Sequence, residues 1–93
     1  MPLKGYYEHG GLSRDKVDLH KVIFRTLFES DVAIDRKDLE TVVHGQSMLH
    51  NIRAVKGEIA RLHNLGFLER TEKGRLRIPA ALTNQIHKFV KSK

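Results

Sequence analysis

Residues 61–69 read Arg61-Leu62-His63-Asn64-Leu65-Gly66-Phe67-Leu68-Glu69, and here a helical pattern gives way to a strand pattern. Glycine is common just after the last helical turn, because it adopts the left-handed backbone conformation without a Cβ penalty. Gly66 is therefore the expected end of a helix, and Phe67 and Leu68 are expected to begin a strand. The sequence thus predicts helix before residue 66 and β-structure after it.

A β-hairpin is predicted directly after this junction. Lys73-Gly74 supplies the turn, and residues 75–78 alternate with the period of two that is typical of a half-buried strand. Leu76 and Ile78 point to one face. The basic side chains of the hairpin gather at its tip and on the other face; they are Arg70, Lys73, Arg75 and Arg77.

Upstream of Gly66 the sequence predicts a helix of about four turns. Apolar residues recur at spacings of four, three, four and three, which gives one continuous buried stripe. The stripe consists of Met48, Ile52, Val55, Ile59 and Leu62. Ser47 is the expected N-cap, since its hydroxyl can accept a hydrogen bond from the first helical turn.

The opposite face of this helix is expected to be cationic and open. Rotation by about 100° per residue brings a histidine, two arginines and small residues to that side. They are His50, Arg53, Gly57 and Arg61, with Ala54 and Ala60 at the edges. Glycine inside a helix costs about 1 kcal/mol relative to alanine. Gly57 therefore indicates either a close backbone approach or a position of no consequence.

Two further helices are predicted before residue 47. The first begins near Ser13 or Asp15 as N-cap and carries a broad apolar stripe over about four turns. The stripe consists of Leu19, Ile23, Phe24, Leu27 and Phe28. His20 lies beside it and is interpreted as a core or boundary histidine rather than a ligand.

The second of these helices is short. Asp35 with Asp38 forms a variant of the capping box at its start, and Gly45 is the expected end. Its apolar face is expected to hold Leu39, Val42 and Val43. Residues 32–34, Val-Ala-Ile, form a short β-capable segment in front of it.

The two ends of the chain are expected to differ. Residues 1–14 are predicted to be an irregular, flexible arm, in which Tyr6 and Tyr7 more often cover a core than stack on a base. Residues 79–93 are predicted to form an amphipathic helix, opened by Pro79. Its stripe can dock on the core of its own domain or on a second copy, and a dimer contact is favoured. The stripe consists of Leu82, Ile86, Phe89 and Val90.

Composition narrows the class of protein. The chain has 93 residues, which fits one domain. It has no cysteine, which excludes disulfides and thiolate sites and fits a cytoplasmic protein. The net charge is +6, and residues 47–93 carry ten basic and three acidic side chains, whereas residues 1–46 carry seven and eight. A basic half favours a polyanionic partner, with nucleic acid first and an anionic membrane surface second; a solvated lysine-rich surface explains the charge equally well.

The predicted order of helix, short strand, helix, turn, helix and hairpin resembles the winged-helix family of helix-turn-helix DNA-binding domains over about residues 15–78. The segment 61–69, with its Leu-Gly-Phe-Leu signature, and the basic hairpin after it carry the likeness. The resemblance implies a mainly α fold with a small β-hairpin: a three-helix core, a wing and an extra C-terminal helix. It also implies binding of double-stranded DNA, with the third helix in the major groove.

The resemblance assigns DNA contacts to two parts of the chain. On the helix face these are Ser47, His50, Asn51, Arg53, Ala54, Gly57 and Arg61. On the wing they are Arg70, Lys73, Arg75 and Arg77. Arginine can donate two hydrogen bonds to guanine, and basic wing residues supply affinity that does not depend on base sequence.

Several functions stay open at this point. A small dimeric transcriptional regulator, prokaryotic or viral, is preferred; the alternatives are a module that binds an acidic protein and a non-specific replication or packaging factor. None of the six histidines is paired with another at helical metal-site spacing, and no phosphate loop is visible. No catalytic residue, metal, cofactor, small-molecule ligand or membrane contact is expected.

Overall fold

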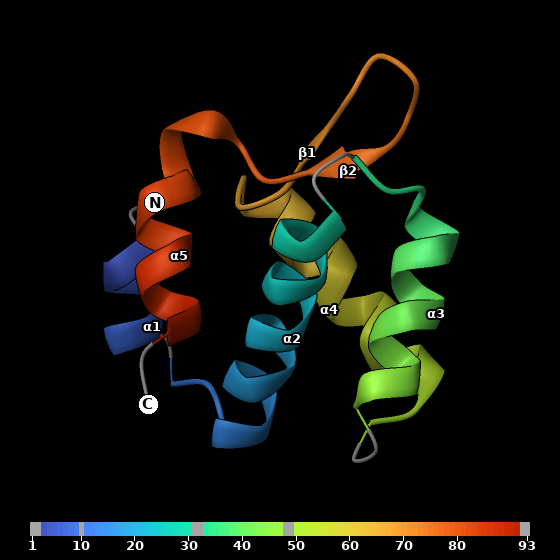
Figure 1. The fold of residues 1–93 in the computed structure, drawn as a ribbon. Helices are drawn as coiled ribbons and strands as arrows, with labels where there is room; N and C mark the ends of the chain where they lie inside the picture. The colour runs from blue at the N-terminus through green and yellow to red at the C-terminus, as the bar shows by residue number, and fades with distance from the viewer. Residues whose placement is uncertain (1–2, 10, 31–32, 48–49, 92–93) are drawn as a thin grey trace.

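The chain is mainly helical with one small antiparallel sheet (Figure 1). The computed structural model describes residues 3–9, 11–30, 33–47 and 50–91. The elements run in the following order: α1 (Leu3–His9), α2 (Arg14–Ser30), α3 (Arg36–Gln46), α4 (Ile52–Asn64), β1 (Glu69–Arg70), β2 (Leu76–Arg77), a 3₁₀ turn (Ala80–Leu82) and α5 (Thr83–Lys91).

Helix α2 is the centre of the molecule. It packs against α3, α4 and α5, and Figure 1 shows it running between α5 on one side and α3 on the other. Leu19, Ile23 and Phe24 are almost completely buried, as their spacing predicts. The Ser13 hydroxyl accepts a hydrogen bond from the backbone N–H of Lys16 at 3.3 Å, which confirms Ser13 as a cap of this helix.

Helix α3 departs from its prediction in three places. Asp35 precedes it, but its side chain makes no capping hydrogen bond. Val42 is 42% exposed, and Glu40 takes a buried position instead. The helix continues through Gly45 to Gln46, so the predicted end at Gly45 is wrong by one residue. Leu39 and Val43 are fully buried and hold α3 on the core without Val42.

The start of α4 was also predicted wrongly. Ser47 terminates α3, and the N-cap of α4 is Asn51, whose side-chain oxygen accepts a hydrogen bond from Ala54 N at 2.8 Å. The helix therefore begins at Ile52, which is 38% exposed rather than buried. Of the remaining stripe, Val55, Ile59 and Leu62 are fully buried. Met48 lies outside the described residues.

The helix-to-hairpin junction is confirmed. Gly66 has φ +85°, a conformation that side chains with a Cβ rarely adopt, and Gly74 in the turn has φ +79°. The strands pair Glu69 with Arg77 and Arg70 with Leu76. Strand β1 therefore begins at Glu69, and the prediction that Phe67 and Leu68 begin the strand is wrong, because both side chains are buried in the core before the pairing starts. Ile34 forms a bridge to Leu76, which ties the segment before α3 to the hairpin.

The N-terminal segment is ordered, contrary to prediction. Residues 3–9 form α1, and Leu3 is 2% exposed. The Tyr7 ring stacks on Phe89 of α5 with centroids 4.0 Å apart, and the Tyr6 ring meets Phe67 edge-on at 5.5 Å. Burial of these aromatic rings supplies the stabilisation that local helix propensity lacks. The irregular, flexible arm predicted for residues 1–14 is therefore wrong for residues 3–9.

Helix α5 uses its apolar stripe within the chain. Ile86 is completely buried, and the other three members, Leu82, Phe89 and Val90, are partly buried against the same core. The stripe lies against α1 and α2 of the same chain, and the dimer contact predicted for it stays a prediction. Its pattern alone could not distinguish a partner subunit from the chain's own helices. No helix in the described ranges is long and apolar enough to cross a membrane.

Candidate nucleic-acid interface

The outward face of α4 carries three cations. Arg53, Lys56 and Arg61 are exposed, and Gly57 lies among them. Ala54 and Ala60 are half-buried at the edges, as expected for small flanking residues. The apolar stripe of this helix therefore faces the core. Its solvent-exposed face is basic and includes the small residues Ala54, Gly57 and Ala60.

Two residues of this face were missed at the sequence level. Lys56 and Asn64 are both exposed. Asn64 follows Arg53 by 11 residues, about three helical turns, so both lie on the same side of the helix. Helical periodicity alone was sufficient to find both residues.

Three residues assigned to the helical face lie before the helix instead. Ser47 and His50 are hydrogen-bonded to each other, hydroxyl oxygen to Nδ1, at 2.7 Å. Asn51 is the N-cap, and its side-chain oxygen is occupied by the Ala54 N–H. The assignment of these residues to the helix surface is therefore wrong, because the helix starts later than the stripe implied.

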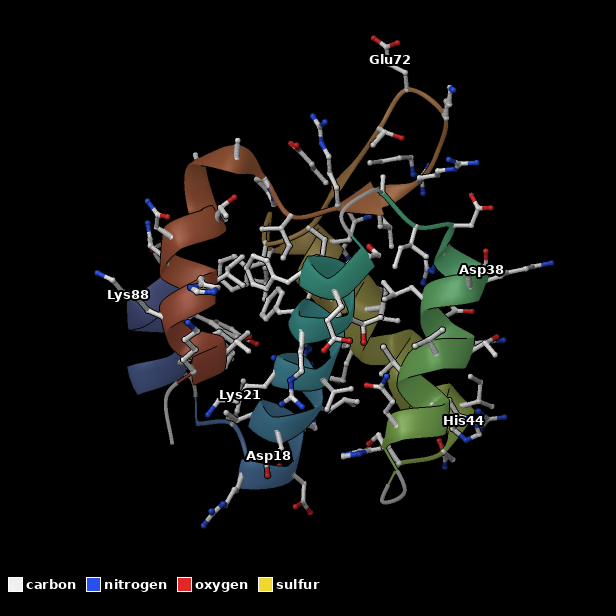
Figure 2. All side chains as sticks on the ribbon, viewed as in Figure 1. Asp18, Lys21, Asp38, His44, Glu72 and Lys88 are labelled. Carbon is white, nitrogen blue, oxygen red and sulfur yellow. The ribbon has the colours of Figure 1, made fainter. Side chains whose placement is uncertain are left out.

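All four basic residues of the hairpin are exposed and line one shallow hollow of about 450 Å³. They are Arg70, Lys73, Arg75 and Arg77, with Ala33, Thr71 and Glu72 completing the lining. Figure 2 shows Glu72 at the far tip of this loop, well away from the helices. A concave surface with four cations is suited to binding an anion.

Two of these arginines are in ion pairs. The Nε atom of Arg77 lies 2.7 Å from Glu69 Oε1, and that of Arg75 lies 3.5 Å from Asp35 Oδ1. Exposed pairs of this kind contribute only about 0–1 kcal/mol, so a phosphate group can replace either carboxylate. Among the described residues, Arg70 and Lys73 form no ion pair.

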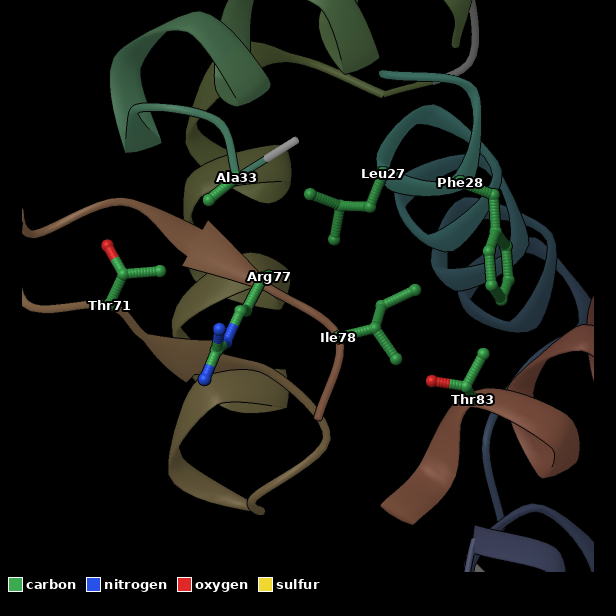
Figure 3. Close-up of a pocket in the computed structure, with 7 residues that line it drawn as sticks. All are labelled: Leu27, Phe28, Ala33, Thr71, Arg77, Ile78 and Thr83. Atoms are coloured by element: carbon green, nitrogen blue, oxygen red, sulfur yellow. The ribbon is translucent and has the colours of Figure 1, made fainter. Parts of the chain in front are cut away.

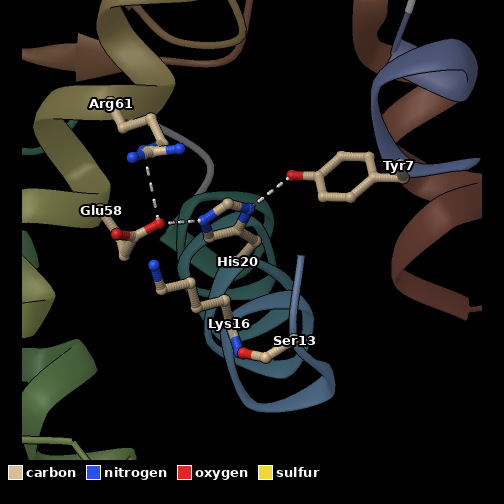
Figure 4. Close-up of polar contacts among 6 residues, drawn as sticks. All are labelled: Tyr7, Ser13, Lys16, His20, Glu58 and Arg61. Carbon is tan, nitrogen blue, oxygen red and sulfur yellow. Dashed lines mark hydrogen bonds and ion pairs between the residues drawn. The ribbon is translucent and has the colours of Figure 1, made fainter. Parts of the chain in front are cut away.

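Behind α4 lies a buried chain of hydrogen bonds that joins three helices (Figure 4). His20 of α2 is completely buried. Its Nδ1 atom is 2.8 Å from the Tyr7 hydroxyl, and its Nε2 atom is 2.8 Å from Glu58 Oε1. A carboxylate only accepts, so Nε2 carries the hydrogen and donates to Glu58, and the Tyr7 hydroxyl donates to Nδ1. The interpretation of His20 as a core histidine is confirmed.

The polar groups of this chain are tuned by burial. Desolvation lowers the pKa of His20, against the opposing effect of Glu58, so the neutral imidazole is favoured. Desolvation also raises the pKa of the Tyr7 hydroxyl far above its ordinary range. Both groups are therefore held in their neutral forms. The hydrogen bonds from Tyr7 to His20 and from His20 to Glu58 link α1, α2 and α4.

The lowered pKa of His20 makes stability depend on pH. Below about pH 6.5 the unfolded chain takes up a proton at this histidine and the folded chain does not, so the free energy of unfolding falls as the solution is acidified. The loss ends below the folded-state pKa. We expect the stability difference between the wild type and His20→Leu, measured by urea unfolding from pH 7.5 to 5, to shrink towards low pH. A constant difference would contradict this assignment.

A second hollow, of about 400 Å³, lies between the end of α2, the hairpin and the start of α5 (Figure 3). Leu27, Phe28 and Ile78 form its apolar wall, and Arg77 is the charged residue that lines it. This arrangement provides no acid–base pair and no nucleophile with a base beside it. No group of three metal-ligating side chains occurs in the part of the chain that is described.

Comparisons with protein-family models, with curated proteins and with solved structures found no match.

Proposed function

We propose that this protein binds double-stranded DNA, with α4 in the major groove and the hairpin on the flanking sugar–phosphate backbone. The order α2, bridge residue Ile34, α3, α4 and β1–β2 is the order of a winged-helix domain, and this supports the proposal. The observation that carries it is the charge of one continuous segment. Residues 52–77, from α4 through the hairpin, hold seven basic and three acidic side chains.

The chemistry of this segment matches the two kinds of contact that DNA offers. Arg53 is exposed on the first turn of α4, and an arginine there can donate two hydrogen bonds to the O6 and N7 atoms of guanine. The hairpin cations meet phosphates, which give affinity without base preference. A small sequence-specific transcriptional regulator fits both features. The apolar stripe of α5 packs on its own chain, so one chain on one duplex site is the smallest unit proposed. The predicted homodimer would place two such chains on a two-fold symmetric site.

The experiment that tests this function is selection of bound duplexes from a random pool, followed by binding titrations. A common sequence should emerge. Arg53→Ala should then cost about 1–3 kcal/mol on the selected duplex and much less on a random one. Lys73→Ala should weaken binding to both by the same factor.

The control for these variants is Lys88→Ala, which removes an exposed lysine from α5 on the opposite side of the molecule from α3 (Figure 2). It should leave both affinities close to those of the wild type. Wild-type protein that binds no duplex at low salt would refute the proposed function. Binding without any enriched sequence would refute the regulator and leave a non-specific DNA-binding protein.

A further inference from the structure

A third hollow lies where α1 meets the second half of α4, and none of the contacts above uses it. Its volume is about 420 Å³. Gly57 and Ala60 are the small residues of its lining, Tyr6 and Leu65 supply apolar surface, and Arg61 and Asn64 supply hydrogen-bond donors. The exposed face of α4 is therefore not flat, and it has a depression beside its last two turns.

Small residues keep this hollow open. A Cβ atom added at Gly57 would meet nothing within 4 Å, so the fold itself does not require glycine there. Glycine in a helix interior is unfavourable by about 1 kcal/mol relative to alanine. Packing within the protein therefore does not explain why residue 57 is a glycine. A ligand group that approaches the helix closely at this position would explain it.

Arg61 has a charged partner on its own helix. Its Nε atom lies 4.0 Å from Glu58 Oε1, and Figure 4 shows this carboxylate in contact in turn with His20. The Arg61 side chain is 50% exposed. Its guanidinium is therefore positively charged and open to solvent at the rim of the hollow.

We propose that this hollow binds a backbone phosphate of the duplex, with Arg61 and the side-chain amide of Asn64 as donors. The inference rests on the proposed function, since the phosphate belongs to a strand that borders the groove holding α4. Arginine binds phosphate oxygens with two parallel N–H donors, and amide side chains are common phosphate contacts. Helix α1 then also belongs to the DNA interface, because its residue Tyr6 lines this hollow. Arg61 accordingly contacts backbone rather than a base.

The test measures binding of two duplexes, the selected sequence and a random one, over a series of salt concentrations. Asn64→Ala should weaken both by about threefold to tenfold. Arg61→Ala should weaken both and reduce the slope of log K against log salt by about 0.9, the value for one phosphate. Gly57→Gln, whose Cβ atom would meet nothing within 4 Å, projects a longer side chain towards the hollow and should weaken both while keeping the wild-type thermal stability or exceeding it. Asn84→Ala, an exposed asparagine on α5, is the matched control and should bind like the wild type.

Three results would overturn the phosphate contact without touching the proposed function. Loss of affinity confined to the selected duplex would make Arg61 and Asn64 base contacts. Wild-type affinity in all three variants, with Lys73→Ala still impaired, would leave the hollow unused. Inorganic phosphate that binds to the wild type but not to Arg61→Ala, and that leaves the affinity for the duplex unchanged at equal ionic strength, would show that the hollow takes the free ion alone. Absence of any duplex binding by the wild type would instead refute the proposed function.

Discussion

Raising the salt concentration from 50 to 200 mM is expected to weaken binding to a random duplex by about a thousandfold. Each phosphate neutralised by a basic side chain contributes about −0.9 to the slope of log K against log salt. Residues 52–77 offer seven basic side chains, and two of them, Arg75 and Arg77, must first leave Asp35 and Glu69. Five to six effective contacts correspond to a slope of about −5. Fluorescence anisotropy with a labelled duplex measures this slope directly.

The ion pairs of Arg75 and Arg77 give a second test of the predicted salt dependence. Glu69→Gln removes the carboxylate that holds Arg77 at 2.7 Å. The variant should bind DNA more tightly at low salt, because a phosphate no longer competes with this carboxylate for Arg77. Glu29→Gln, an exposed carboxylate near the end of α2, is the matched control and should change affinity little. A slope shallower than about −2 would exclude the interface described above.

His20→Leu is expected to lower the free energy of unfolding by about 2–5 kcal/mol, although leucine fills a similar volume. The change leaves the Tyr7 hydroxyl and the Glu58 carboxylate without their shared partner in the core. Buried polar groups that lose a partner cost about 1–3 kcal/mol each, and charged groups cost more. Urea unfolding followed by circular dichroism at pH 7.5 measures the difference.

Tyr7→Phe separates the two halves of this effect. It removes the hydroxyl and keeps the ring that stacks on Phe89. One buried acceptor, Nδ1 of His20, loses its partner, so the expected cost is about 1–3 kcal/mol, less than that of His20→Leu. If His20→Leu proves as mild as Tyr7→Phe, the bond between His20 and Glu58 contributes nothing. The contact between α2 and α4 would then depend on apolar packing alone.

What the sequence could predict depended on how local the signal was. Gly66, Gly74 and the alternation at residues 75–78 define a helix end and a hairpin through backbone conformation and period, and both are present. The stripe of α2 was equally clear, because its buried positions repeat over four turns. These elements required no knowledge of the rest of the fold.

The errors came from choices that tertiary contacts decide. Leu3, Tyr6 and Tyr7 have helical spacing over a single turn, which is too short to predict a helix. Packing on α2, α5 and Phe67 stabilises residues 3–9 as a helix. Asn51 and Ser47 are both good N-caps, and the choice between them moved the start of α4 by several residues. The covering of Ile86 by the same chain could not be distinguished from covering by a second copy. In the candidate site, Arg53, Gly57 and Arg61 were found from period alone, whereas Tyr6 could be placed beside α4 only in three dimensions.

The most direct test of the DNA interface is to record backbone amide NMR shifts of the ¹⁵N-labelled protein as a short duplex is added at low salt. The largest changes are expected in residues 52–64 and 69–77, with amides of α5 nearly unchanged. Changes confined to α5, or no change at all, would contradict the assignment of α4 and the hairpin as a surface that binds DNA.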